Sequence, residues 1–252
     1  MYTDKITSRI LSSDKLISYL TNNKSAVGFC ISGSRMFNLQ DESSDYDINV
    51  IIDNTHSQEI KQFTSYTTAP VLYFKDTETN TKIHWYYHTE SEILNKNLYH
   101  FNLWIVEFYY ATLYDYKANA ISIINDEKYK NFINNTLYKQ YKKSLLELKL
   151  RYNSTINSFK YLSVNDFGNK FRKDHYHLCL ISLLIQNKSV AEYKNALIVL
   201  RNYAKRNAKK FSDTIYTDFD PTIILFAQKN IEWLSNYFDT IESEKDEALT
   251  SI

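Results

Sequence analysis

The composition and charge of this 252-residue chain are those of an ordinary globular protein that is large enough to bury a core of its own. Its 44% hydrophobic and 23% charged residues exclude a disordered or fibrous chain. Residues 1–6 show no basic and apolar leader, and no stretch approaches the ~18 uninterrupted apolar residues of a membrane span, so we expect a cytoplasmic protein without membrane segments. We expect Cys30 and Cys179 to be reduced and to have no chemical role.

The first part of the chain has the hydrophobic pattern of a small sheet with flanking helices. An apolar helical spacing predicts a helix over residues 3–20, and shorter apolar runs bounded by polar turn formers predict strands. We expect strands over residues 26–32, 45–53, 71–75 and 82–87, a helical turn over 35–39 and a helix over 57–66. The last two strands flank a polar turn at 76–80 and should pair as a hairpin, which makes the sheet small and mixed.

From about residue 89 the strand signals fade and helical patterns take over. We expect helices over residues 90–97, 103–114, 127–133, 137–161, 175–186, 190–209 and 221–238. The sequence therefore predicts an α+β protein, with a mixed-sheet domain over residues 1–120 and an α-helical bundle domain over 121–252.

The net charge of +1 conceals an uneven distribution along the chain. Residues 1–125 hold 10 basic and 14 acidic residues, whereas residues 126–238 hold 19 basic and 10 acidic residues. A basic half beside an acidic half is the arrangement expected when a nucleotide or nucleic acid bridges the two. Solvated helix faces would explain the same distribution.

A glycine and two aspartates mark the candidate site. Gly33 is one of only three glycines, and Gly33-Ser34 follows the first strand, where a turn would present backbone amides and a hydroxyl to phosphate. Asp45 and Asp47 are spaced i, i+2 at the start of the next strand, so both carboxylates lie on one face of it. Two adjacent carboxylates suit Mg²⁺.

The run Gly33-Ser34-Arg35, followed by Ser44-Asp45-Tyr46-Asp47-Ile48, resembles the signature of the nucleotidyltransferase superfamily typified by DNA polymerase β. Within it, the motif is similar to a branch of predicted nucleotidyltransferases that includes the RNA-repair-associated family. The motif covers only residues 33–48, with fainter likenesses from Asn102 to Glu107 and over residues 173–177.

The resemblance implies an enzyme that moves an NMP unit from an NTP to an acceptor hydroxyl and releases pyrophosphate. Asp45 and Asp47 would then hold Mg²⁺ or Mn²⁺, one ion with the triphosphate and a second that lowers the pKa of the acceptor hydroxyl. Gly33 and Ser34 would bind the phosphates, with Lys173 as a further nucleotide contact. Arg35 would add a bidentate phosphate contact, or else form a salt bridge to one of the neighbouring acids, which are Asp41, Glu42 and Asp45.

One departure from the family pattern concerns the third carboxylate that active members place on a later strand. The strand over residues 82–87 holds no acid, and His84 occupies the place where we would look for it. On that strand His84, Tyr86 and His88 share one face, so His84 would serve as a metal ligand or general base, or would only bond to a neighbour. Weaker substitutes for the third acid are Asp53, Asp76, Glu78 and Glu107.

Basic and aromatic residues alternate in the helical half, a pattern that suits stacked bases and phosphates as well as a solvated surface. The residues are Lys139, Lys142, Lys143, Lys149 and Arg151 among Tyr138, Tyr141 and Tyr152, followed by Arg201, Lys205, Arg206, Lys209 and Lys210. We therefore favour an RNA or tRNA end slightly over a protein or small-molecule acceptor. The missing acid also motivates an alternative, a catalytically degenerate module that binds a nucleotide or a partner protein as a regulator or antitoxin.

Overall fold

The computed structural model describes residues 26–41, 44–52, 71–75, 82–89, 99–113, 121–123, 126–159, 162–208 and 219–250. The helices expected over residues 3–20, 57–66 and 90–97 lie outside this set. The chain divides into two compact units, Met1–Leu145 and Leu146–Ile252, which we describe separately. The domain boundary expected after residue 120 stays a prediction.

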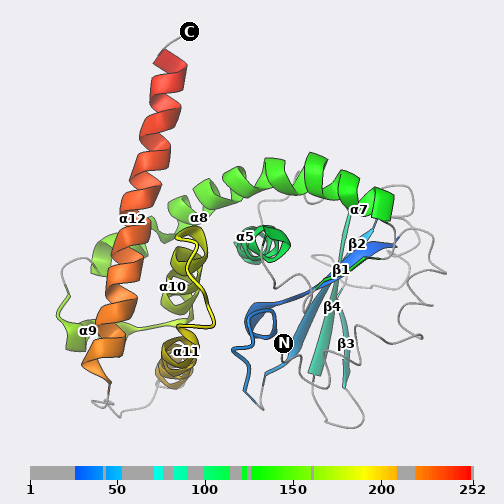
Figure 1. Cartoon of the computed structure of the whole chain (residues 1–252). Helices are drawn as coiled ribbons and strands as arrows, with labels where there is room; N and C mark the ends of the chain where they lie inside the picture. The colour runs from blue at the N-terminus through cyan, green and yellow to red at the C-terminus, as the bar shows by residue number, and fades with distance from the viewer. Residues whose placement is uncertain are drawn as a thin grey trace. The chain divides into compact units, whose positions relative to one another are not determined.

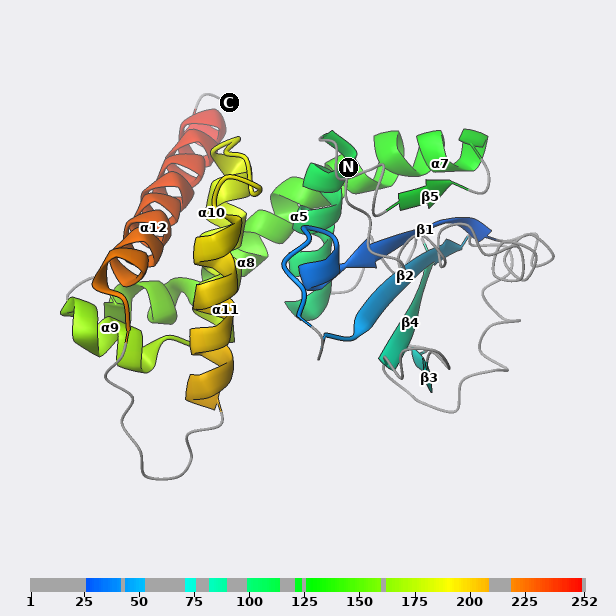
Figure 2. The same ribbon diagram turned by 60° about the horizontal axis from the view of Figure 1, so that its bottom comes forward.

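The first unit is built on a five-stranded mixed sheet with the order β3-β4-β2-β1-β5 (Figures 1 and 2). The strands are β1 (Ala26–Ser32), β2 (Tyr46–Ile52), β3 (Val71–Lys75), β4 (Lys82–Thr89) and β5 (Ile121–Ile123). The pair β3–β4 is antiparallel and β2–β4 is parallel, which confirms the small mixed sheet and the hairpin expected from the sequence. Strand β5 was not expected; it pairs antiparallel with β1.

The two faces of β2 differ in chemistry because successive side chains point to opposite faces of a sheet. Tyr46, Ile48 and Val50 are fully buried on one face, whereas Asp47 and Asn49 point to the other. In the register of the sheet Asp47 lies opposite Ser32 of β1 and His84 of β4. One end of the sheet therefore gathers polar side chains from three strands.

Helices α5 (Tyr99–Leu113) and α7 (Asp126–Phe132) both pack against β1. Trp104 of α5 stacks on the His88 ring of β4 with the ring centroids 4.9 Å apart, so α5 covers the polar face of the sheet. A π-helical segment, Ile133–Leu137, joins α7 to α8 (Tyr138–Phe159). The unit boundary lies within α8.

The second unit is helical. Its remaining helices are α9 (Val164–Lys170), α10 (Lys173–Ile185), α11 (Lys194–Ala208) and α12 (Pro221–Thr250). Helix α12 packs against α9, α10 and α11, and the core of the unit is filled by aliphatic and aromatic side chains. Within the described part of the chain, none of the helices combines the length and the apolar character that crossing a membrane would require.

Candidate active site

A positive-φ glycine begins the candidate site at the end of β1. Gly33 has φ +69° and opens a 3₁₀ turn, Gly33–Arg35, in which the Met36 amide donates to the Gly33 carbonyl at 3.2 Å. A side chain at this φ would be strained, which explains the glycine. A Cβ atom placed on Gly33 would lie 3.6 Å from Asp47 Oδ2, so the turn and the carboxylate are in close proximity.

Apolar anchors and a closed turn fix the described parts of the segment between Gly33 and β2, residues 34–41 and 44–45. Met36, Phe37 and Leu39 are buried beneath it, and the Leu39 amide donates to the Ser34 carbonyl at 2.8 Å. Further along, Ser44 Oγ accepts from the Asp41 amide at 2.9 Å and donates to Asp41 Oδ1 at 3.0 Å. The chain therefore enters β2 in a defined position, which sets where Asp45 and Asp47 point.

The buried guanidinium of Arg35 holds the segment that carries Asp45. Arg35 is only 8% exposed; it donates from Nη2 to the Ser44 carbonyl at 2.6 Å and from Nε to the Asp45 carbonyl at 3.2 Å. Its Nη1 donates to Tyr46 Oη at 2.9 Å, and its Cζ lies 3.8 Å from the centroid of the Tyr46 ring. These contacts place Arg35 against the backbone of the aspartate motif and favour a positioning role.

Alternate residues of the motif therefore have different roles. Ser44 and Tyr46 are buried and bind Arg35 and the loop, whereas Asp45 and Asp47 turn their carboxylates to the polar end of the sheet. The side chains of Asp45 and Asp47 are 47% and 35% exposed, so a ligand from solvent can reach both carboxylates.

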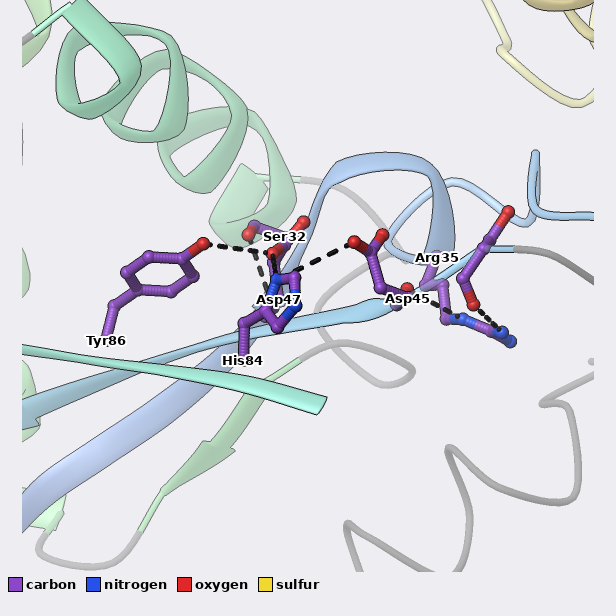
Figure 3. Close-up of polar contacts among 7 residues, drawn as sticks. Ser32, Arg35, Asp45, Asp47, His84 and Tyr86 are labelled. Carbon is purple, nitrogen blue, oxygen red and sulfur yellow. Dashed lines mark hydrogen bonds and ion pairs between the residues drawn. The ribbon is translucent and has the colours of Figure 1, made fainter. Parts of the chain in front are cut away.

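His84 lies between the two carboxylates (Figure 3). Its Nδ1 atom is 3.2 Å from Asp47 Oδ1 and 3.6 Å from Asp45 Oδ2. One ligand atom from each of the three residues lies within 4.8 Å of the others. The strand alternation made His84 a candidate partner of the aspartates, and in the structure the three residues lie together.

These donors suit a divalent cation. Two carboxylate oxygens are the hard ligands that Mg²⁺ and Mn²⁺ both accept, and an imidazole nitrogen moves the preference toward Mn²⁺. Two of the three ligand atoms come from the neighbouring strands β4 and β2, and the third comes from the residue just before β2. His84 Nδ1 lies within hydrogen-bonding distance of Asp47 Oδ1, so the binding of a cation would compete with this contact.

A network of polar side chains supports Asp47, and sequence reasoning missed most of it. Tyr86 Oη donates to Asp47 Oδ1 at 3.3 Å, and Ser32 Oγ donates to the Asp47 carbonyl at 3.3 Å. Asn49 Nδ2 donates to Ser32 Oγ at 2.9 Å, and its Oδ1 lies 2.9 Å from His88 Nε2. The alternation of polar residues on β2 and β4 was the signal from which this network could have been found.

Glu107 reaches the site from a distant part of the chain. This carboxylate of α5 is 3% exposed, and its Oε2 atom accepts from the Gly33 amide at 3.4 Å. Together with burial, its negative charge raises the pKa of the Cys30 thiol well above the ordinary value. Glu107 thus lies beneath the glycine turn rather than among the three grouped ligand atoms.

Two further residues named from the sequence belong to the second unit. Lys173 is exposed at the start of α10 in the second unit, and its nucleotide-binding role stays a prediction. His175 is buried, and its Nδ1 atom accepts from the Arg172 amide at 2.7 Å, so it caps α10. Burial lowers the His175 pKa to about 4, which keeps the ring neutral at pH 7.

The structure divides the basic set of α8 into two kinds of residue. Lys139, Lys142 and Lys143 are exposed, whereas Lys149 is buried with its Nζ atom 3.3 Å from Asp239 Oδ1. Tyr152 is buried as well, and Tyr141 stacks on another tyrosine ring of the first unit. The surface open to a polyanion is therefore smaller than the sequence suggested.

Comparisons with known proteins give little further information. No family model and no curated protein matches the sequence. Among solved structures, the chain is similar to a nucleotidyltransferase-like protein from Exiguobacterium sibiricum 255-15, with 13% identity and a TM-score of 0.27 over 92% of this chain and 75% of that chain. A TM-score this low does not establish a common fold, so we base the functional proposal on the site.

Proposed function

We propose that this chain is a metal-dependent nucleotidyltransferase that moves an NMP unit from an NTP to an acceptor hydroxyl and releases pyrophosphate. The observation that carries the proposal is the convergence of Asp45, Asp47 and His84 beside a glycine turn with positive φ. The motif from Gly33 to Asp47 supports it independently, through its resemblance to the polymerase β superfamily.

Nucleotidyl transfer demands two things of such a site. Negative charge builds on the phosphate oxygens in the transition state and must be neutralised, and the acceptor hydroxyl must lose its proton. Asp45 and Asp47 would hold Mg²⁺ or Mn²⁺, which supplies positive charge to the phosphates and lowers the pKa of the acceptor hydroxyl. Ser34 and the amides that follow Gly33 would bind the phosphate chain, while Arg35 keeps the Asp45 segment in place.

His84 has two possible roles, which exclude each other at Nδ1. With a proton on Nδ1 the ring donates to Asp47 Oδ1, and Nε2 is then the basic atom that can accept the acceptor's proton. Without that proton, Nδ1 would be a third ligand of the cation and would replace the expected carboxylate. The second role predicts a stronger dependence on Mn²⁺ than the first.

We infer the class of acceptor from the charge of the exposed side chains. Lys139, Lys142 and Lys143 fall on one exposed helical face through their i, i+3 and i, i+4 spacing. Such a face attracts the phosphates of an RNA or tRNA end, whereas a polycationic small molecule would call for an acidic surface. RNA is therefore the acceptor that we favour over a protein hydroxyl or a small molecule.

A second candidate function follows from the ligand set. In the described ranges, the grouped side chains that can hold a cation are two acids and a histidine rather than three acids. A site of this kind also suits a module that binds a nucleotide or partner without turnover, as a regulator or antitoxin would.

One experiment separates the two functions. The protein is incubated with each α-³²P-labelled NTP, with Mg²⁺ or Mn²⁺, and with total cellular RNA and protein from a matched extract. An active transferase labels one acceptor class, and the label disappears in Asp45→Ala/Asp47→Ala but persists in the exposed-acid control Asp126→Asn. Tight NTP binding without transfer under every condition would reject the enzymatic function and support the binding module.

A further inference from the structure

The second unit contains a pocket that the proposed chemistry does not use. It has a volume of about 310 Å³, at the lower end of the range of about 300–1,000 Å³ typical of small-molecule sites. Aromatic and basic side chains from the end of α10, the turn before α11 and one face of α12 line it. The lining residues include Lys188, Tyr193, Phe226, Lys229, Asn230 and Trp233.

Local geometry places Lys188 beside the pocket. Asn187 has φ +56°, a left-handed conformation that asparagine tolerates better than most residues. The Asn187 amide donates to the Leu184 carbonyl at 3.0 Å, and the Lys188 amide donates to the Leu183 carbonyl at 2.9 Å. These two bonds end α10 in a compact turn, so the position of Lys188 is fixed by the backbone.

Helix α12 supplies the facing wall. Phe226, Lys229, Asn230 and Trp233 recur at i, i+3, i+4 and i+7, which places all four on one helical face. The Phe226 ring stacks on Tyr193, with centroids 5.2 Å apart and planes inclined by 18°. The aromatic surface is therefore partly preformed.

Fixed amide groups form the polar part of the lining. Asn230 is 6% exposed; its Oδ1 atom accepts from Gln186 Nε2 at 3.1 Å and its Nδ2 atom donates to the Phe226 carbonyl at 2.9 Å. Gln186 Nε2 also donates to Ser182 Oγ at 2.8 Å. Because these groups bind one another, the polar lining is held in place before any ligand arrives.

The charge of the pocket is positive. Lys188 and Lys229 are both exposed, and neither forms an ion pair with a carboxylate within the parts of the chain that the structure describes. Aromatic faces bind planar rings by stacking, and ammonium groups bind phosphate oxygens. A ligand that joins a planar ring to an anionic phosphate satisfies both sets of groups at once.

We propose that this pocket binds a nucleoside phosphate, with its base on the aromatic surface of Tyr193, Phe226 and Trp233 and its phosphate at Lys188 and Lys229. Either a free nucleotide or the terminal nucleotide of a single-stranded RNA carries this chemistry. The lining residues lie within the stretches 186–193 and 226–233 of the second unit, so this binding can be tested separately from the proposed transfer reaction.

The test uses the full chain with Asp45→Ala/Asp47→Ala and EDTA, which disables the candidate metal site. The probes are AMP, ATP, inorganic triphosphate and a 5′-phosphorylated oligoadenylate of five nucleotides. The indole N–H signals are followed by NMR and the Trp233 signal is assigned with Trp233→Phe. Trp104, which lies in the first unit, serves as an internal control.

We expect saturable shifts of the Trp233 signal with AMP, ATP and the oligonucleotide, and none with triphosphate alone. Lys188→Ala/Lys229→Ala should weaken binding at least about tenfold, while the control Lys128→Ala/Lys130→Ala on α7 of the first unit should leave it unchanged. Tighter binding of the oligonucleotide than of AMP assigns an RNA end, and equal binding assigns the free nucleotide. Shifts confined to Trp104, the lack of any Trp233 shift at millimolar ligand, or binding unaffected by the double lysine change in a folded variant would each overturn the proposal.

Discussion

Replacement of Arg35 tests whether this residue positions the aspartate segment or contacts the phosphates. The structure buries its guanidinium against the Ser44 and Asp45 carbonyls and the Tyr46 ring. In Arg35→Ala the Ser44 carbonyl and the Tyr46 hydroxyl lose buried donors, each at a cost of about 1–3 kcal/mol. The Asp45 carbonyl is partly buried, so water can replace its donor more readily.

These contributions are not additive, and we expect Arg35→Ala to lower the free energy of unfolding by about 3 kcal/mol. For a chain of this length such a loss lowers the melting temperature by about 6–12 °C, which calorimetry or circular dichroism would measure. Because the Asp45 backbone is released, the affinity for Mn²⁺ should fall as well, in the absence of any nucleotide. Arg35→Lys keeps the charge but not the planar fork, and it should fall between Arg35→Ala and the unsubstituted chain.

The matched control is Arg206→Ala, which removes an exposed arginine whose Cζ lies 5.5 Å from the centroid of the Tyr203 ring. We expect this change to alter the free energy of unfolding by less than about 1 kcal/mol. An Arg35→Ala protein with unchanged stability and Mn²⁺ affinity, but weakened NTP binding, would refute the positioning role and restore the phosphate contact.

Three further predictions concern residues outside the site. Burial lowers the pKa of His175 to about 4, so the folded chain binds this proton at a lower pH than the unfolded chain does. The free energy of unfolding should therefore fall by up to about 3 kcal/mol as the pH is lowered from 6.5 to 4. Chemical denaturation of His175→Gln should show a flatter pH profile over this range. Lys149→Ala should lower the free energy of unfolding by about 1–2 kcal/mol, because it removes a buried side-chain stem and a hydrogen bond to the Phe238 carbonyl. RNA affinity, measured by filter binding, should not change. A selective loss of RNA affinity would contradict the buried position of Lys149. Burial raises the Cys179 pKa to about 12, so this thiol should resist alkylation by iodoacetamide at pH 8 until the chain is unfolded, and rapid labelling in the native protein would be inconsistent with the structure.

Much of the sheet could be predicted from the sequence because its signals are local. The apolar run of residues 26–32 coincides with β1, and the strand expected over 45–53 is β2, Tyr46–Ile52. Strand β5 has only three residues and depends on pairing with β1, so no local pattern marks it. Helix α9 is short and was missed for a similar reason.

The site shows the same division between local and distant information. The spacing of Asp45 and Asp47 predicted that their carboxylates share one face, and the strand alternation made His84 a candidate neighbour of that pair. Glu107 lies far along the chain from Gly33, and only the packing of α5 on the sheet brings them together. The role of Arg35 could not be predicted in the same way, because the acids at positions 41, 42 and 45 suggested a salt bridge, whereas its guanidinium donates to the backbone carbonyls of Ser44 and Asp45.

The central claim is that Asp45, Asp47 and His84 form one cation site. Its most direct measurement is a titration of the full chain with Mn²⁺ followed by electron paramagnetic resonance, repeated with Mg²⁺ as competitor. We predict one class of site that is lost in Asp45→Ala/Asp47→Ala, weakened at least about tenfold in His84→Ala, and retained in Asp126→Asn. Mn²⁺ binding of unchanged affinity and stoichiometry in the folded double aspartate variant would contradict the account.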